Sequence, residues 1–308
     1  MEILLQVVLL VVGFVMLVKG ADWFVDGAAG IAAKFKIPQI VIGLTIVAMG
    51  TSAPEAAVSI TSALKGNAGI TIGNIVGSNI LNVLIILGLS AVVTPLAVTK
   101  STIKVDIPVM IAITGILLWM GYDGIVTLLE GIILLLIFAS YIGYLMYVAF
   151  KDRKNNTEEV KEISVIKALI CTVVGLVLIV WGSDVTVDAA TKIAKILGLS
   201  ERFIGLTIVA LGTSLPELFT SVMAARKGNA DIAIGNIVGS NIFNILFVVG
   251  LSALVIPVPF LEGFRFDLLV SLAAAMLLFF CVLKNQKLNR WAGILMLASY
   301  AAYFAVIL

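Results

Sequence analysis

A long internal repeat constrains this chain more than any other feature of its sequence. Shifting the sequence by 162 positions places residues 41–91 over residues 203–253 without a gap, and 34 of the 51 aligned positions are identical. The same register extends toward the N-terminus through three more identical pairs: Gly20/Gly182, Asp22/Asp184 and Asp26/Asp188. Self-similarity of this length indicates two copies of one structural unit that pack against each other.

A polar segment marks the boundary between the two copies. Residues 151–162 (KDRKNNTEEVKE) are the longest polar stretch in a chain that is 61% hydrophobic and only 12% charged. We therefore expect a first half at residues 1–150, a charged linker at 151–162 and a second half at 163–308.

The apolar residues are gathered in runs long enough to cross a bilayer. A soluble chain is about 45–50% apolar and about 25% charged, and a membrane span needs roughly 20 mostly apolar residues. Each half contains five such runs, at about 3–33, 37–64, 69–93, 105–122 and 125–150, then 164–197, 203–225, 232–255, 266–283 and 291–308. The sequence predicts an all-α polytopic membrane protein of ten transmembrane helices. The first run of each half is long and is expected to break at Gly20 or Gly182, and two alternatives stay open for it: one tilted span, or a span with an interfacial helix.

Five spans per half means that the second half enters the membrane in the opposite sense to the first. With the N-terminus outside, thirteen Lys and Arg residues fall in internal connections and five in external ones, as the positive-inside rule requires. We expect the protein in the cell (inner) membrane, with both termini on the outer side and the linker in the cytoplasm. Inverted repeats are typical of secondary transporters, whose site lies at the midplane between the repeats.

Composition excludes several other functions. The chain has no histidine and a net charge of +2, which excludes imidazole metal sites and His-assisted triads and leaves no basic stripe for nucleic acid. Cys171 and Cys281 stand in apolar runs, where we expect them to be packing residues. We expect no enzyme activity, no cofactor and no obligatory protein partner; the partners are the lipid bilayer and the transported ions.

Two polar motifs interrupt the apolar runs of each half. The first is GTSAPE at residues 50–55 and GTSLPE at 212–217, and the second is GNIVGSNILN at 73–82 with its copy GNIVGSNIFN at 235–244. Each first motif places a glutamate, Glu55 or Glu217, well inside a span. A charge at that depth costs roughly 3 kcal/mol or more and marks a functional site.

The prolines of the first motifs are expected to free backbone oxygens near the glutamates. Pro54 and Pro216 cannot donate to the carbonyls of Gly50 and Gly212. Thr51 and Glu55 are four residues apart and should share one helix face, and further oxygen-bearing stripes recur at the same spacing: Asn74/Ser78/Asn82 and Asn236/Ser240/Asn244. Carboxylate, amide, hydroxyl and carbonyl oxygens without sulfur or imidazole favour a hard cation such as Ca²⁺. Other recurrent polar residues are assigned packing, capping or interfacial roles: Asn74, Asn79, Asn236, Asn241, Asp22, Asp26, Asp184 and Asp188.

Together these motifs resemble the α-1 and α-2 repeats of the calcium/cation antiporter superfamily, in its sodium/calcium exchanger branch. The resemblance covers the whole chain and implies a Na⁺/Ca²⁺ antiporter that works by alternating access, with the long first and sixth spans sliding across a core bundle. It implies a calcium site formed by the carboxylates of Glu55 and Glu217 and the carbonyls of Thr51 and Thr213, completed by Asn82 and Asn244. Sodium sites would flank it, with Ala48, Ser52 and Ser78 on one side and Ala210, Ser214 and Ser240 on the other.

Departures from related families refine this expectation. Potassium-dependent relatives carry an aspartate where Asn244 stands, so the amide argues against K⁺ transport. Proton-coupled relatives carry a different first motif and often a histidine. The short linker leaves no room for a large cytosolic calcium-sensing domain, which makes the chain prokaryotic-like. Three alternatives remain: a Ca²⁺/H⁺ antiporter that uses the same glutamates as proton carriers, a passive cation channel, and an intramembrane hydrolase, which the lack of a catalytic dyad disfavours.

Overall fold

The computed structural model describes residues 2–66, 68–152, 164–197 and 210–307, and these are helical apart from four two-residue strands. The elements of the first half are α1 (Glu2–Phe35), α2 (Gln39–Ile42), η1 (Gly43–Val47), α3 (Ala48–Thr51), α4 (Ala53–Leu64), α5 (Gly69–Leu81), η2 (Asn82–Leu87), α6 (Gly88–Val93), β1 (Leu96–Ala97), η3 (Thr102–Asp106), α7 (Ile107–Met120), η4 (Gly121–Asp123), β2 (Ile125–Val126) and α8 (Leu128–Asp152). Those of the second half are α9 (Val165–Ile196), α11 (Ala210–Thr213), α12 (Leu215–Arg226), α13 (Ala230–Phe243), η6 (Asn244–Val249), α14 (Gly250–Val255), β3 (Val258–Pro259), α15 (Glu262–Leu283), β4 (Lys287–Leu288) and α16 (Arg290–Ile307).

The helices of the described residues confirm the predicted polytopic membrane protein. Eight are long and apolar enough to cross a bilayer, and a bent pair, Gln39–Thr51 with Ala53–Leu64, supplies a ninth span. The tenth predicted span, 203–225, is described only from residue 210 onward, as α11 and α12. The expected linker at 151–162 lies outside the described residues except at its first two positions.

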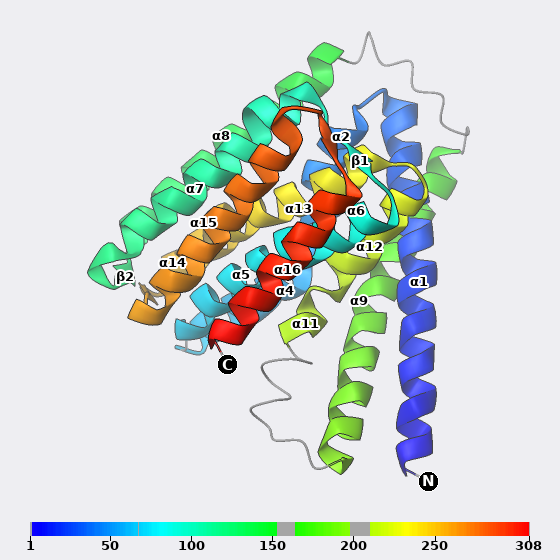
Figure 1. The fold of residues 1–308 in the computed structure, drawn as a ribbon, viewed down its shortest axis with the longest axis horizontal. Helices are drawn as coiled ribbons and strands as arrows, with labels where there is room; N and C mark the ends of the chain where they lie inside the picture. The colour runs from blue at the N-terminus through cyan, green and yellow to red at the C-terminus, as the bar shows by residue number, and fades with distance from the viewer. Residues whose placement is uncertain (1, 67, 153–163, 198–209, 308) are drawn as a thin grey trace.

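Helices α1 and α9 form a long antiparallel pair at one side of the molecule (Figure 1). Each is one continuous helix, which agrees with the alternative of a single span, and the breaks expected at Gly20 and Gly182 are absent. The glycines instead let the two backbones approach: a Cβ on Gly20 would lie 2.9 Å from the Gly175 carbonyl oxygen, and one on Gly182 would lie 3.0 Å from that of Gly13. Small residues are used for such close approach between helices in membranes.

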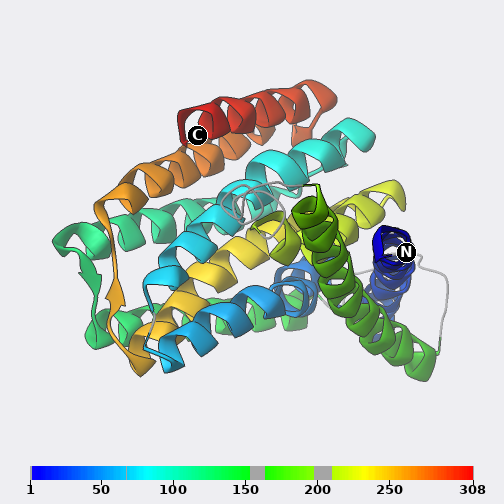
Figure 2. The same ribbon diagram turned by 90° about the horizontal axis from the view of Figure 1, so that it is seen from below.

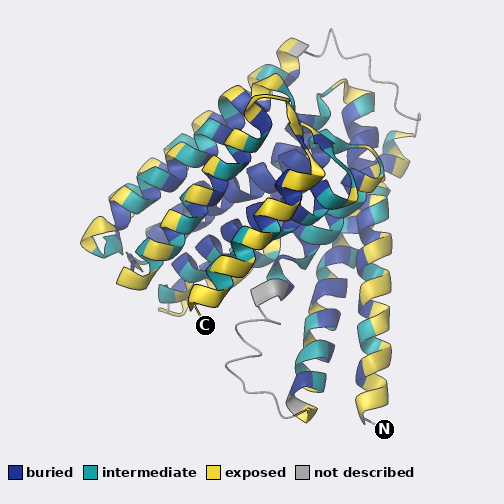
Figure 3. Ribbon diagram, in the orientation of Figure 1, coloured by how far each residue is buried: buried dark blue, intermediate teal, exposed yellow. Residues whose placement is uncertain are grey.

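The remaining helices form a tilted bundle beside this pair, as the view from below also shows (Figure 2). The consecutive segments α5–η2–α6 and α13–η6–α14 run through its centre and are the most buried spans (Figure 3). Helices α7, α8, α15 and α16 flank them and expose apolar side chains such as Leu136 and Phe280. An outer surface of this kind suits contact with lipid chains.

Two short β-ribbons tie the halves together and obey the repeat. Strand β1 pairs antiparallel with β4, and β2 pairs antiparallel with β3. The offset of 162 converts β1 into β3 and β2 into β4, so each ribbon is the repeat-related copy of the other. Connections between the halves are therefore made twice, in equivalent places.

Candidate functional site

The two glutamates lie in the first turn of α4 and α12, and each of these helices begins where a serine interrupts the helical path. Ser52 precedes α4 and Ser214 precedes α12, and each of these helices carries a proline in its first two positions. Proline is tolerated there because the first turn has no helical acceptor for its missing N–H. Across the break at Ser52 the axis bends by 50°. The bend directs side chains on either side of it to different neighbours.

This bend corrects the expectation that Thr51 and Glu55 share one face. The Thr51 hydroxyl donates to Asn236 Oδ1 of the second half at 2.9 Å, whereas Glu55 Oε1 accepts from Ser78 and Ser214. The four-residue spacing predicts a shared face only within an uninterrupted helix, and the helix ends at Thr51.

The carbonyls of Gly50 and Gly212, which lose a helical donor to the prolines, were expected to lack a hydrogen bond, but each accepts one. In the first half, the backbone at the end of α3 donates to the Gly50 carbonyl. In the second half, the Ser183 hydroxyl of α9 donates to the Gly212 carbonyl at 2.6 Å. Ser183 corresponds in the repeat to Ala21, so this bond has no counterpart in α1.

Each glutamate is held by the serine of the opposite half. Ser52 Oγ donates to Glu217 Oε1 at 2.7 Å, and Ser214 Oγ donates to Glu55 Oε1 at 3.3 Å. Ser52 and Glu55 have the spacing of a capping box, but Ser52 makes no capping bond to its own helix. The exchange of partners brings the two carboxylates, each only 1% exposed, into one cluster between the halves.

The predicted flanking residues separate into two groups that each mix the halves. One group contains Glu217, Ser52 and the Ala48 carbonyl, to which Ser240 Oγ donates at 3.4 Å. The other contains Glu55, Ser78 and Ser214, whose hydroxyl oxygens are 3.4 Å apart. These contacts differ from the expected grouping of Ala48 and Ser52 with Ser78, and of Ser214 with Ser240, and the assignment of the sodium sites stays a prediction. Of the remaining predicted residues, Ala210 begins α11.

Four buried oxygens at the centre have no hydrogen-bond partner within the protein. They belong to the four side chains assigned to the central site: Glu55 Oε2, Glu217 Oε2, Asn82 Oδ1 and Asn244 Oδ1. Among the described residues neither glutamate has a Lys or Arg within ion-pair distance. Buried charges and buried polar atoms are costly when unpaired. A cation held by oxygen ligands would satisfy all four atoms.

A closed set of amide bonds fixes the two central asparagines. Asn79 Nδ2 donates to the Asn241 carbonyl at 3.3 Å, and Asn241 Nδ2 donates to the Asn79 carbonyl at 3.2 Å. Asn241 Oδ1 accepts from Asn82 Nδ2 at 3.0 Å, and Asn79 Oδ1 accepts from Asn244 Nδ2 at 3.1 Å. The amide nitrogens of Asn82 and Asn244 are thereby occupied, which leaves the oxygens of both for a ligand. Both residues begin a π-helical segment, η2 or η6, a feature that is frequent at functional sites.

The other two asparagines of the motifs support the glutamates from behind. Asn74 Nδ2 donates to Ser59 Oγ at 2.9 Å and to the Glu55 carbonyl at 3.3 Å, and Asn236 repeats this with Ser221 and the Glu217 carbonyl. The packing and backbone-satisfying roles expected for these residues agree with their contacts.

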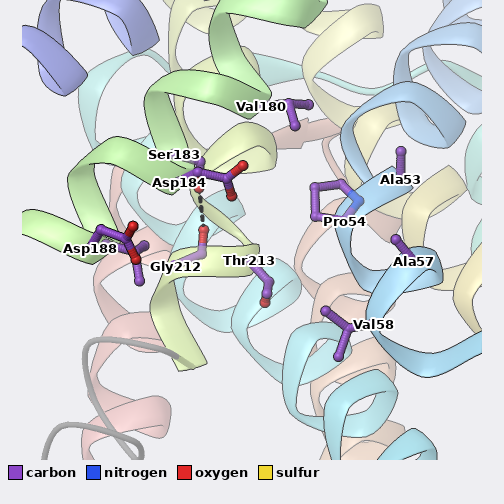
Figure 4. Close-up of a pocket in the computed structure, with 11 residues that line it drawn as sticks. Ala53, Pro54, Ala57, Val58, Val180, Ser183, Asp184, Asp188, Gly212 and Thr213 are labelled. Atoms are coloured by element: carbon purple, nitrogen blue, oxygen red, sulfur yellow. Dashed lines mark hydrogen bonds between the residues drawn. The ribbon is translucent and has the colours of Figure 1, made fainter. Parts of the chain in front are cut away.

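A cavity of about 610 Å³ lies beside this cluster. It separates α4 from α9, and Figure 4 shows Pro54 on one wall and Asp184 on the other, with Gly212 and Thr213 below. Its lining residues Ala53 and Thr213 are the direct neighbours in sequence of Ser52 and Ser214. The cavity therefore lies next to the cluster, although neither glutamate is among its lining residues.

The structure also assigns contacts that the sequence reasoning missed. Lys227, which directly follows α12, forms ion pairs with Asp22 and Asp26 of α1. These aspartates lie inside a continuous helix and therefore do not cap it, whereas the interfacial role that was the other expectation stays a prediction. The available signal was the recurrence of all three residues at the repeat offset, as Lys65, Asp184 and Asp188.

Known proteins share this architecture over its full length. The solved structure of the sodium–calcium exchanger NCX_Mj, soaked with zero Na⁺ and Ca²⁺, superposes with a TM-score of 0.87 at 35% identity, covering 99% of this chain and 100% of that one. The sodium/calcium exchanger MaX1 of Methanosarcina acetivorans is 33% identical over 97% of both chains. The inner membrane protein YrbG of Escherichia coli is 33% identical over 99% of this chain and 97% of its own.

Fold and site together define a multi-pass transport protein of two inverted repeats, and the likeness to NCX_Mj agrees with the predicted ten helices. The sequence pattern of the family described as sodium/calcium exchanger protein matches residues 5–147 and 167–308, which are nearly the whole of both halves. The chain belongs to this family, and the predicted resemblance is confirmed.

Proposed function

We propose that this protein exchanges Ca²⁺ for several Na⁺ across the membrane and does not require K⁺. The observation that carries the proposal is the set of four unpartnered buried oxygens on Glu55, Glu217, Asn82 and Asn244. Two carboxylates balance the charge of one Ca²⁺, and Ca²⁺ accepts six to eight oxygen ligands in flexible geometry. The family relationship and the name of MaX1 support the same ion pair.

Competition between the two ions would use the two groups that flank the centre. Na⁺ bound beside Glu217, Ser52 and the Ala48 carbonyl would draw that carboxylate away from Ca²⁺, and the group around Glu55 would act in the same way. Because both glutamates belong to the calcium site and to a sodium group, filling the sodium groups lowers calcium affinity. The amide at Asn244 in place of an acid supports K⁺ independence.

The arrangement supports alternating access with both termini outside the cell membrane and the linker inside. The distribution of basic residues supports that orientation. The cavity along α9 would then open toward the outside, on the side of Lys65. An exchange of more than two Na⁺ for one Ca²⁺ moves net charge, so the membrane potential contributes about 2.3 kcal/mol per charge per 100 mV.

Radiolabelled Ca²⁺ uptake into proteoliposomes tests the proposal. Vesicles loaded with Na⁺ are diluted into Na⁺-free medium, matched vesicles carry only an outward proton gradient, and a third set contains K⁺ on neither side. We expect uptake driven by Na⁺ with or without K⁺. Because more than two Na⁺ leave for each Ca²⁺ that enters, uptake should increase when a K⁺ ionophore makes the interior positive.

The controls separate the site from general damage. Glu55→Gln should abolish uptake, whereas Asp106→Asn removes another buried carboxylate, bonded to Tyr141 outside the site, and should retain it. Uptake driven by protons alone would identify a Ca²⁺/H⁺ antiporter. Rapid flux without a counter-ion would identify a channel, and wild-type uptake by Glu55→Gln would refute the site.

A further inference from the structure

The two halves hold the same three charged residues in two different arrangements. Lys227 Nζ lies 2.7 Å from Asp22 Oδ1 and 2.6 Å from Asp26 Oδ1, and it donates to the Asp22 carbonyl at 2.8 Å. Their repeat-related copies are Lys65, Asp184 and Asp188. Within the described part of the chain, no ion pair joins Lys65 to either aspartate.

Helix packing differs between the halves in the same way. Helix α1 packs along α12, whose last residue is followed by Lys227. The equivalent pair in the repeat is α9 with α4, whose last residue is followed by Lys65. Here the cavity lies between the two helices, and Asp184 and Asp188 line it from α9 while Val58 lines it from α4. One arm of the protein is closed and ion-paired, and its counterpart is open and unpaired.

These two arrangements lie on either side of the middle of the α1–α9 pair. Phe24, between Asp22 and Asp26, packs on Gly175, well before Asp184 in α9. Beyond Gly182, near Asp184 and Asp188, α9 packs on Gly13 of α1. The lysines therefore act on opposite sides of the central glutamates.

From this asymmetry we infer that the two triads are alternate ionic latches: Lys227 with Asp22 and Asp26 holds α1 against α12 when the cavity along α9 is open, and Lys65 with Asp184 and Asp188 holds α9 against α4 when the opposite side is open. The inference rests on the proposed function, because only a protein that exposes its site to each side in turn needs both latches. In an inverted repeat the second state is the first with the roles of the halves exchanged.

The latches set the balance between the two states. Removing the charge of Lys227 destabilises the state described here, and removing that of Lys65 destabilises the other, so the two substitutions should shift the population in opposite directions. Neither lysine belongs to the central site, and both lie at the ends of helices that carry a glutamate in their first turn.

Cysteine accessibility measures this balance without requiring transport. In a background with Cys171→Ala and Cys281→Ala, the matched reporters are Val58→Cys, in the cavity wall, and its repeat partner Thr220→Cys, at a position with no exposed surface. The full chain is placed in proteoliposomes and labelled with a membrane-impermeant maleimide, from each side and without Na⁺ or Ca²⁺.

We expect Lys227→Gln to slow labelling at position 58 and to speed it at position 220, each by at least about threefold. Lys65→Gln should slow labelling at position 220. At position 58 it should speed labelling, or leave it unchanged if that rate is already maximal. Lys227→Arg, which keeps the charge, and Lys19→Gln, an exposed change elsewhere on α1, should match the parent. Shifts in the same direction for both lysine variants, or rates within about twofold of the parent for Lys227→Gln at both positions, would overturn the inference.

The same preparations separate this inference from the proposed function. Opposite labelling shifts together with uptake that does not respond to Na⁺ would leave the latches standing and refute Na⁺/Ca²⁺ exchange. Na⁺-driven uptake with unchanged labelling would refute the latches alone.

Discussion

The contacts at the centre of the molecule obey the internal repeat, whereas those along the α1–α9 pair do not. At the centre, nearly every contact occurs twice: the bonds between Asn79 and Asn241 are mutual, and each glutamate is held by the serine of the other half. Along α1 and α9 the copies diverge, since α1 is ion-paired to α12 while α9 stands across a cavity from α4.

This difference indicates where binding and movement are divided in the structure. A site that keeps its twofold relation in both states needs no rearrangement of its ligands, because exchange of the two halves leaves it the same. Movement is then left to the two helices whose surroundings already differ. Four changes, from the largest expected effect to the smallest, test that division.

The largest effect is expected at the carboxylates, where the two halves should be equivalent. Glu55→Gln and Glu217→Gln each remove one of two charges that balance Ca²⁺, so both should reduce Na⁺-driven Ca²⁺ uptake to background. The measurement is uptake into proteoliposomes, with protein content and thermal stability checked in parallel. Abolition by one variant and near-normal rates in the other would show that the centre is functionally asymmetric.

Next in size is the loss of the mutual amide bonds. Asn79→Leu removes the donor to the Asn241 carbonyl and the acceptor for Asn244, and unsatisfied buried groups cost about 1–3 kcal/mol each. We expect a clear fall in the unfolding temperature of the detergent-solubilised protein. Asn241→Leu is the matched variant and should lower it by a similar amount; a neutral effect of either would contradict the proposed cross-link.

A smaller effect is expected where α1 and α9 meet. Gly20→Ala places a methyl group 2.9 Å from the Gly175 carbonyl oxygen, and such overpacking typically costs about 1–3 kcal/mol. We expect slower uptake with an intact central site, measured as a reduced maximal rate at unchanged half-saturating Ca²⁺. Gly115→Ala, whose added methyl meets no atom within 4 Å, serves as the control and should leave the rate unchanged.

The smallest effect is expected at a contact that only the second half makes. Ser183→Ala removes the 2.6 Å bond to the Gly212 carbonyl, and the net contribution of such a bond is about 1 kcal/mol. We expect a modest loss of thermal stability. Ala21→Ser adds the missing hydroxyl to α1, where α1 has no such bond to lose, so it should not reproduce that loss.

Sequence reasoning singled out the residues of the buried central cluster because their signal is local. A glutamate beside a proline in the middle of a span, repeated at a fixed offset, needs no knowledge of packing to stand out. All four side chains expected at the central site carry an unpartnered oxygen in the structure. The assignment of these residues as ion ligands stays a prediction until transport by the variants is measured.

The grouping of the flanking residues could not be predicted in the same way. Spacing shows which residues share a face of one helix, but not which face of one half meets the other. Ser78 thus contacts Ser214 instead of joining Ser52. The break expected at Gly20 failed for a related reason, since a glycine that breaks a helix and one that admits a neighbouring backbone look the same in sequence.

The mutual bonds between Asn79 and Asn241 have a consequence for how the chain is built. In an isologous interface, residue i of one subunit contacts residue j of the other, and j contacts i in return. The interior contacts of this protein are reciprocal in the same way, between residues 162 positions apart. The chain therefore resembles an antiparallel dimer whose two subunits are fused into one polypeptide. Fusion frees the two copies to differ: α9 could acquire Ser183 while α1 kept Ala21, which no dimer of identical subunits allows.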